Sequence, residues 1–234
     1  MKKPNTHASD AIGYILMASV NAIMDTAVKR KDAALMERML NEMRVLELSD
    51  KKLDNIQIDF FHKIGDSIQA FNHTETYMTQ YMMSETVKSI RQRDSVTYQN
   101  GMQFYLTGKK DSLEDKTEFD FQKMINTNQH ARLIQSQIEQ LITPLVLKIK
   151  NKNPLKKMLQ WSNYALELEP ISSLSIQNQA ILLYKNGETQ KAIPLFSKEI
   201  DRLNKTKVED DNHKMGERLV AMKEQLEKMK RGTL

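Results

Sequence analysis

The sequence predicts an all-α protein, an antiparallel stack of helix hairpins of the α-solenoid type with a C-terminal capping helix, and three observations support this expectation. Glycine and proline, which interrupt helices, are few, at seven and five of 234 residues. Aromatic residues make up 6% of the chain, and the apolar–polar alternation of strands is hard to find. From Pro154 to Asn204 the chain nearly repeats itself at an offset of 34 residues, so that Leu159 maps to Ile193. A period of about 34 residues is typical of a helix–turn–helix unit that stacks on a neighbour.

The first three helices are predicted where a short polar side chain precedes an apolar stripe. Such a side chain can accept hydrogen bonds from the amide groups of the first helical turn. The candidate capping residues are Ser9 or Asp10, then Asp32, then Ser49 or Asp50. The first helix should run to about Lys31. The third should continue through Gly65, which is expected to allow close helix packing and not to end the helix.

Helices are expected along the remainder of the chain as well. Their predicted ranges are a fourth helix after His73 or Thr74, then Asp94–Leu106, Glu118–Asn126, His130–Lys150, Leu155–Glu167, Ser173–Lys185, Thr189–Asn204 and Asp210–Lys230. The polar stretch Lys109–Lys116 is the expected flexible joint. Pro144 should kink its helix or divide it in two, because proline removes a backbone hydrogen bond. Pro170 and Gly187 mark turns between helices.

These elements predict two regions. Residues 1–108 would form an N-terminal helical region that could contain degenerate repeats, and residues 117–234 a repeat region with its capping helix. The alternative is one continuous superhelix. The charged fraction of 28%, mixed along the chain, argues against wholesale disorder.

The residue inventory excludes several kinds of chemistry. Cysteine is absent, which removes disulfides, thiolate metal sites and a cysteine nucleophile. The five histidines do not form the His-Glu-x-x-His spacing that places two metal ligands on one helical face. Leu106–Lys110 ends like a nucleotide-binding loop but lacks its leading glycine. We therefore expect a protein that is not an enzyme and holds no cofactor or metal ion.

The N-terminal segment has two interpretations. A pair of lysines followed by the apolar segment Ala11–Val20 faintly resembles a signal peptide. The apolar pattern continues at helical spacing as far as Val28, which favours a buried first helix. The segment is too short to span a membrane, and Asn21 and Asp25 make it too polar.

Several positions in the last third of the chain follow the pattern of a known repeat. Ala180 and Ala192 are small where the two helices of one unit would cross, and Gly187 lies in the turn between them. The matching apolar positions are Leu183, Tyr184, Ile193 and Phe196. This segment resembles a tetratricopeptide repeat, and the likeness covers roughly residues 140–234. Pro144, Glu199, which replaces a usual small residue, and Pro194 depart from the pattern, which implies irregular packing.

A narrower likeness concerns two segments. Leu155–Ala165 and Leu182–Gly187 are similar to helical regions found beside thioredoxin-fold domains in bacterial envelope proteins. The likeness implies a module of a larger redox protein and a periplasmic or envelope location, with a cytoplasmic location as the alternative. The chain has no Cys-x-x-Cys, so it cannot perform that redox chemistry itself.

Repeat stacks usually present surfaces to partners, so we expect a scaffold that binds a protein or peptide. In such stacks the first helix of each unit lines a concave face, and here that helix would expose Leu174, Asn178, Ile181 and Lys185. An Asn and a Lys one or two turns apart could hold the backbone or the carboxylate of an extended peptide. An ordinary polar helix surface is the plainer interpretation. The identity of the partner and the oligomeric state stay open.

A second functional class is a helical nucleic-acid-binding or regulatory protein. It would use the lysines clustered between Lys148 and Lys157, in a chain with a net charge of +5. A nucleic-acid binder more often shows a concentrated basic face with interleaved aromatic residues, so a solvated rim beside a turn is the favoured interpretation.

Overall fold

The structure is a computed structural model that describes residues 6–45, 47–207 and 213–234. All regular elements in this part of the chain are helical, which confirms the predicted fold class. They are α1 (Thr6–Arg30), α2 (Ala33–Val45), α3 (Asp50–Ile64), α4 (Ser67–Tyr77), the π-helical turn η1 (Met78–Met82), α5 (Val87–Gly101), α6 (Gln103–Leu106), α7 (Lys116–Asn126), α8 (Gln129–Val146), α9 (Lys152–Leu168), α10 (Ser173–Lys185), α11 (Thr189–Lys207) and α12 (His213–Lys230).

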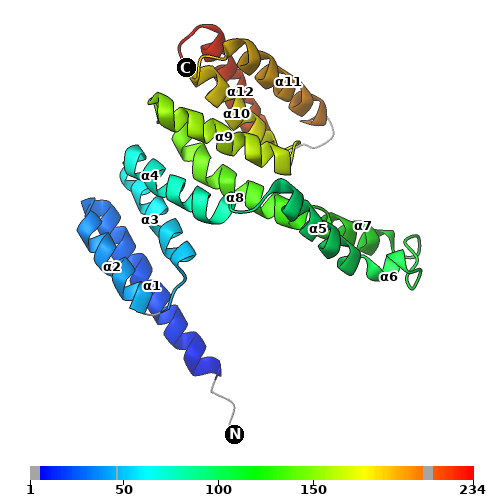
Figure 1. Cartoon of the computed structure of the whole chain (residues 1–234), viewed down its shortest axis with the longest axis horizontal. Coiled ribbons are helices and arrows are strands. Elements are labelled where there is room, and N and C mark those ends of the chain that lie inside the picture. Colours follow the sequence, from blue (N-terminus) through cyan, green and yellow to red (C-terminus); the bar gives the residue numbers. More distant parts are fainter. Residues whose placement is uncertain (1–5, 46, 208–212) are drawn as a thin grey trace. The chain divides into compact units, whose positions relative to one another are not determined.

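The chain divides into two compact units, Met1–Tyr77 and Met78–Leu234. The polar loop before α7, which was the expected joint, therefore lies inside the second unit. Within that unit, α8 contacts α9, α9 contacts α10, α10 contacts α11 and α11 contacts α12 (Figure 1). The helices over residues 155–204 pack each against the next, which confirms the predicted stacking of consecutive hairpins.

The first unit packs α1 to α4 around methionine and phenylalanine side chains. Met36, Met43 and Phe60 are almost fully buried. The expected cap of α2 is present, since the amide group of Leu35 donates to Oδ1 of Asp32 at 2.9 Å. Satisfying an amide group in this way stabilises a helix by about 1 kcal/mol.

The expectation for Gly65 is wrong. Its φ of 81° lies in the left-handed region, where glycine ends helices, and no atom lies within 4 Å of the position that a Cβ would take. Gly65 thus terminates α3 and does not allow close packing. Asp66 then begins α4 by accepting from the amide group of Gln69 at 3.0 Å.

Two other boundaries in the middle of the chain also differ from the prediction. His73 and Thr74 lie inside α4 and do not begin a helix, and the predicted fifth helix is divided into α5 and α6. In η1 the amide group of Met83 donates to the carbonyl group of Met78 at 2.8 Å, five residues back. At five residues this wider turn is too short to leave a signal in apolar periodicity.

The core of the second unit includes three of the residues singled out in the sequence, Ala180, Ala192 and Phe196. Ala180 and Ala192 are both fully buried, and α10 packs against α11, as expected for small residues at a helix crossing. Gly187 has a φ of 87° in the turn between them. Phe196 is fully buried, and removing its ring would cost about 3–5 kcal/mol. Pro144 lies within α8, which continues as one helix to Val146.

Candidate functional site

The four residues expected to hold a peptide lie on α10, but two of them are packed against neighbouring helices. Asn178 and Ile181 are each 2% exposed, and Nδ2 of Asn178 donates to Oγ1 of Thr143 in α8 at 2.8 Å. The expectation that α10 exposes these two residues is wrong, because α8 covers this side of the helix. Leu174 is half-buried. Capture of a peptide by this set stays a prediction.

Lys185 caps the C-terminal end of α8. Its Nζ donates to the carbonyl oxygens of Val146, Leu147 and Ile149 at 2.8, 3.1 and 2.5 Å. These carbonyl groups have no partner within the helix, so a cation there is stabilising. Burial, and then the positive charge of Lys150, lower the pKa of Lys185. Its three bonds leave little capacity for the carboxylate of a ligand.

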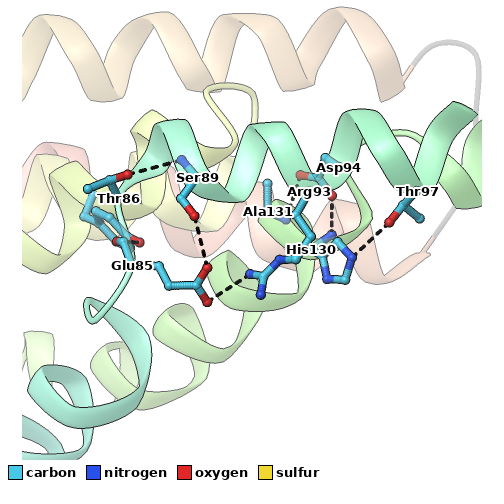
Figure 2. Close-up of polar contacts among 9 residues, drawn as sticks. Glu85, Thr86, Ser89, Arg93, Asp94, Thr97, His130 and Ala131 are labelled. Carbon is cyan, nitrogen blue, oxygen red and sulfur yellow. Dashed lines mark hydrogen bonds and ion pairs between the residues drawn. The ribbon is translucent and has the colours of Figure 1, made fainter.

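A polar centre in the second unit joins α5 to α8 (Figure 2). The carboxylate of Asp94, which is 4% exposed, accepts from the amide groups of His130 and Ala131 at 2.6 and 3.1 Å. These groups lie in the first turn of α8, whose own N-cap residue makes no side-chain cap. Asp94 therefore serves as the cap from another helix.

The same centre contains a hydroxyl–imidazole pair. Oγ1 of Thr97 lies 3.1 Å from Nε2 of His130 (Figure 2). A hydroxyl group beside an imidazole is the arrangement of a nucleophile and its base. A catalytic triad also needs a carboxylate on the second ring nitrogen. Asp94 instead accepts hydrogen bonds from backbone amide groups. We therefore interpret the Thr97–His130 pair as a contact between α5 and α8.

Glu85 connects this region to α9. Its carboxylate pairs with Arg93 at 3.1 Å, and its carbonyl oxygen accepts from the hydroxyl group of Tyr164 at 2.8 Å. Burial, and then the negative charge of Glu85, raise the pKa of Tyr164. Thr86 caps α5 by accepting from the amide group of Ser89 at 3.2 Å. These contacts hold α5 and α9 together.

Two buried carboxylates meet the N-terminal turn of α10. Glu139 of α8 is 8% exposed and accepts from Ser172 and, at 2.7 Å, from Ser175. Glu199 of α11 is 2% exposed and accepts from Ser173. Negative charge is stabilised at this end of a helix, because the amide groups there have no internal partner.

Arg202 completes the pairing of Glu199. Its Nε and Nη2 atoms donate to the two carboxylate oxygens at 2.8 and 2.6 Å, in the bidentate form that suits guanidinium and carboxylate groups. Nη2 also donates to Oγ of Ser173 at 2.6 Å. The hydrogen bond to Glu199 raises the pKa of Arg202. A buried glutamate at position 199 is thus explained by the fold.

An open groove of about 800 Å³ lies beside this ion pair. It is bordered by α9, α10 and α11 and by the turn between α9 and α10. Its apolar lining consists of Leu166, Pro170, Ile171, Ile176 and Leu195. Its charged lining consists of Lys198, Glu199, Asp201, Arg202 and Lys205. Ligand-binding pockets are mostly apolar with a few placed polar groups, and this hollow has that character.

The sequence reasoning missed this groove. Two signals for it were present: a large apolar residue, Ile171, within a predicted turn, and cationic residues one helical turn apart on α11. Ile171 is 72% exposed, which is unusual for a large apolar residue in a turn. Most residues that line the groove come from α11, whereas the prediction concerned α10.

The lysine cluster is placed as expected. The five side chains flank the turn between α8 and α9 and are exposed; they are Lys148, Lys150, Lys152, Lys156 and Lys157. A smaller hollow of about 330 Å³ between α7 and α8 is lined by Met124, Ile125, Gln129, Arg132 and Leu133.

No protein-family model, curated protein or solved structure matches the chain. Among the described residues no helix is both long and apolar enough to cross a membrane. In that same part of the chain, no three acidic or histidine side chains converge as metal ligands would. Fold and site define an all-α protein whose helices pack in sequential pairs, with a groove on one side of its second unit.

Proposed function

We propose that this chain is a non-catalytic helical-repeat scaffold, similar to tetratricopeptide-repeat proteins, that binds a protein or peptide partner. One observation carries the proposal: the groove between α9, α10 and α11 exposes apolar side chains beside a row of cations. Exposed apolar surface rimmed by polar groups marks interaction sites on soluble proteins. The polar clusters around Asp94, Glu139 and Glu199 support the proposal of a scaffold, because their side chains hold helices together.

The partner site in this proposal differs from the one expected on α10. Asn178 and Lys185 are engaged by α8, whereas Ile171 and Lys198 face the groove with exposed side chains. A ligand gains affinity from side chains that are exposed before it binds, since no internal contact must be broken.

Selection from a displayed random peptide library tests the proposal. Ile171→Asp places a charge in the apolar lining at a position that is 72% exposed, so the fold should be unaffected. Val220→Asp makes the same change at a 58% exposed site on α12, outside the groove, and is the matched control. Selected peptides should lose at least about tenfold in affinity for Ile171→Asp, which is about 1.4 kcal/mol, and nothing for Val220→Asp. Failure to select peptides that depend on Ile171 would refute the proposed function.

The exposed lysines near the turn between α8 and α9 support a second candidate, binding of nucleic acid. Phosphate contacts release counterions, so affinity for an oligonucleotide would fall steeply with salt concentration. Replacing Lys150, Lys152 and Lys156 by Gln should flatten that dependence if the cluster binds phosphate. A weak dependence that these substitutions leave unchanged would eliminate this candidate.

The likeness of Leu155–Ala165 and Leu182–Gly187 to helical regions beside thioredoxin-fold domains extends the main proposal to a module of a larger envelope protein. The coding sequence upstream of Met1 is the direct test of this extension. An in-frame thioredoxin-like domain would support it, and a normal start site would make the chain a free-standing scaffold.

A further inference from the structure

The cationic side of the groove has a regular spacing. Lys198, Arg202 and Lys205 follow one another at intervals of four and three residues, so they lie on one face of α11. At 1.5 Å per residue, Lys198 and Lys205 are separated by about 10 Å along the helix axis. Both lysines are exposed. The row therefore offers two ammonium groups at a defined separation beside an apolar surface.

The negative charges in the groove do not cancel this row. Glu199 is 2% exposed and is used by Arg202 and Ser173, so it presents little charge to a ligand. Asp201 is the other carboxylate in the lining, and it is exposed. With Arg202 balanced by Glu199, two lysines stand against one aspartate. The groove thus favours a ligand that carries negative charge along this edge.

The apolar side limits the ligand further. Leu166, Ile171, Ile176 and Leu195 line the groove, and Ile171 is the most exposed of these side chains. A simple anion such as phosphate would leave this surface exposed to water. At about 25 cal/mol for each Å² of apolar surface covered, a ligand with its own apolar side chains gains much of its affinity here.

The backbone around the groove selects the form of the ligand. An extended peptide gains affinity by adding a strand to the open edge of a sheet. The walls of this groove are α9, α10 and α11, whose backbone groups bond within each helix. A helical ligand satisfies its own backbone and presents apolar side chains at every turn, so it fits such walls better.

From the groove's lining and the lysine spacing we infer that the occupant is an acidic amphipathic helix of another protein. Its apolar stripe covers Ile171 and Leu195, and two carboxylates seven residues apart meet Lys198 and Lys205. Seven residues of the ligand helix rise about 10 Å, the same separation as that of the two lysines. This inference rests on the proposed function and names the class of partner for the same groove.

Helical peptides with blocked ends and one leucine stripe test the inference by fluorescence anisotropy on the full chain. The peptides differ only in the pair of glutamates beside the stripe, which are three, four or seven residues apart. A matched peptide has lysines seven residues apart, and polyglutamate supplies charge without an apolar stripe. The peptide with a seven-residue glutamate spacing should bind at least about tenfold more tightly than the lysine peptide, and less tightly as salt rises.

Variants assign the contacts. The pair Lys198→Glu and Lys205→Glu should weaken the glutamate peptide about tenfold or more and strengthen the lysine peptide, since the charges are exchanged. Lys223→Glu and Lys230→Glu reverse two exposed charges at the same spacing on α12 and should change neither affinity. Ile171→Asp should weaken the peptides that carry a leucine stripe.

The remaining outcomes overturn the inference. Equal binding of glutamate and lysine peptides, each lost in Ile171→Asp, would show a groove without an acidic preference and leave the proposed function standing. Polyglutamate that binds as well as the amphipathic peptide would show a simple anion site. If no helical peptide binds while the library yields extended sequences that depend on Ile171, the helical class is wrong and the scaffold function holds.

Discussion

The carboxylate of Asp94 accepts a hydrogen bond of 2.6 Å from the backbone amide group of His130, so α5 supplies the N-terminal cap of α8. The two residues are 36 positions apart in the chain. A cap usually comes from the residue next to the helix. Here the residue in that position, Asn128, has a φ of 51° and makes no side-chain cap. The start of α8 therefore depends on its packing against α5.

Asp94→Ala should destabilise the second unit by about 2 kcal/mol, because it removes a cap and leaves buried amide groups without a partner. Asp115→Ala is the control. Asp115 caps α7 at an exposed site by accepting from the amide group of Glu118 at 3.0 Å, and its loss should cost about 0.5–1 kcal/mol. Urea unfolding followed by the fluorescence of Trp161, a buried residue of α9, measures both changes. Equal losses in the two variants would contradict a special role for Asp94.

The stability of the first unit should fall as the pH is lowered through the range in which His73 titrates. Burial lowers the pKa of His73 below its ordinary value of 6.5, and the nearby charge of Asp54 only partly opposes this. The unfolded chain then binds a proton at a higher pH than the folded chain does. Stability from this residue is therefore complete above pH 6.5 and is lost as the pH falls toward the folded pKa.

His73→Phe tests this pH dependence. The ring of His73 stacks on Phe61 with centroids 5.0 Å apart, so phenylalanine keeps the contact and removes the titration. Unfolding followed by far-UV circular dichroism at about pH 7.5 and 5.5 should show a smaller pH effect in the variant than in the unmodified chain. Asp54→Asn should enlarge the effect, because the charge that favours protonation is lost. An undiminished pH effect in His73→Phe would assign it to another group.

Glu199→Ala should destabilise the second unit, although the repeat pattern that residues 140–234 resemble has a small residue at this position. The change removes the carboxylate that accepts from Arg202 and Ser173 and leaves a cavity in its place. Breaking a buried pair from one side typically costs about 3–5 kcal/mol. Arg202 is 47% exposed, so water can solvate its guanidinium group once Glu199 is gone. The loss in the free energy of unfolding should therefore be smaller, about 2–3 kcal/mol.

The double variant Glu199→Ala with Arg202→Met checks this explanation. Because it removes both charges, it should recover part of the stability lost in Glu199→Ala alone. Losses that add independently in the double variant would show that the two residues do not act as a pair.

Features set by neighbouring residues could be predicted from the sequence. The cap at Asp32, the turn at Gly187 and the small residues Ala180 and Ala192 each follow from local geometry, and the structure has all of them. Gly65 was misjudged because a glycine inside an apolar stripe is compatible with both a close crossing and a helix end.

The contacts between distant helices could not be predicted in this way. Asn178 pairs with Thr143, and Lys185 with carbonyl groups at the end of α8; polar residues on a helix give no sign of such partners. The same holds for the groove, whose lining residues come from three helices and one turn. Periodicity shows which face of a helix is apolar but does not show what covers its polar positions.

A variant of Lys185 distinguishes a ligand-binding role from the structural role that the contacts with α8 indicate. If Lys185 served only to hold a ligand, Lys185→Met would leave the stability of the second unit unchanged. Because its ammonium group donates to three carbonyl groups at and just after the C-terminal end of α8, we expect a loss of about 1–3 kcal/mol in the stability of the second unit. Lys191→Met is the matched control. Lys191 lies on α11 and pairs with Glu188 at 2.7 Å in an exposed position, where an ion pair contributes about 0–1 kcal/mol. Urea unfolding followed by Trp161 fluorescence separates the two, and a Lys185→Met variant as stable as Lys191→Met would show that the cap at the end of α8 does not stabilise the protein.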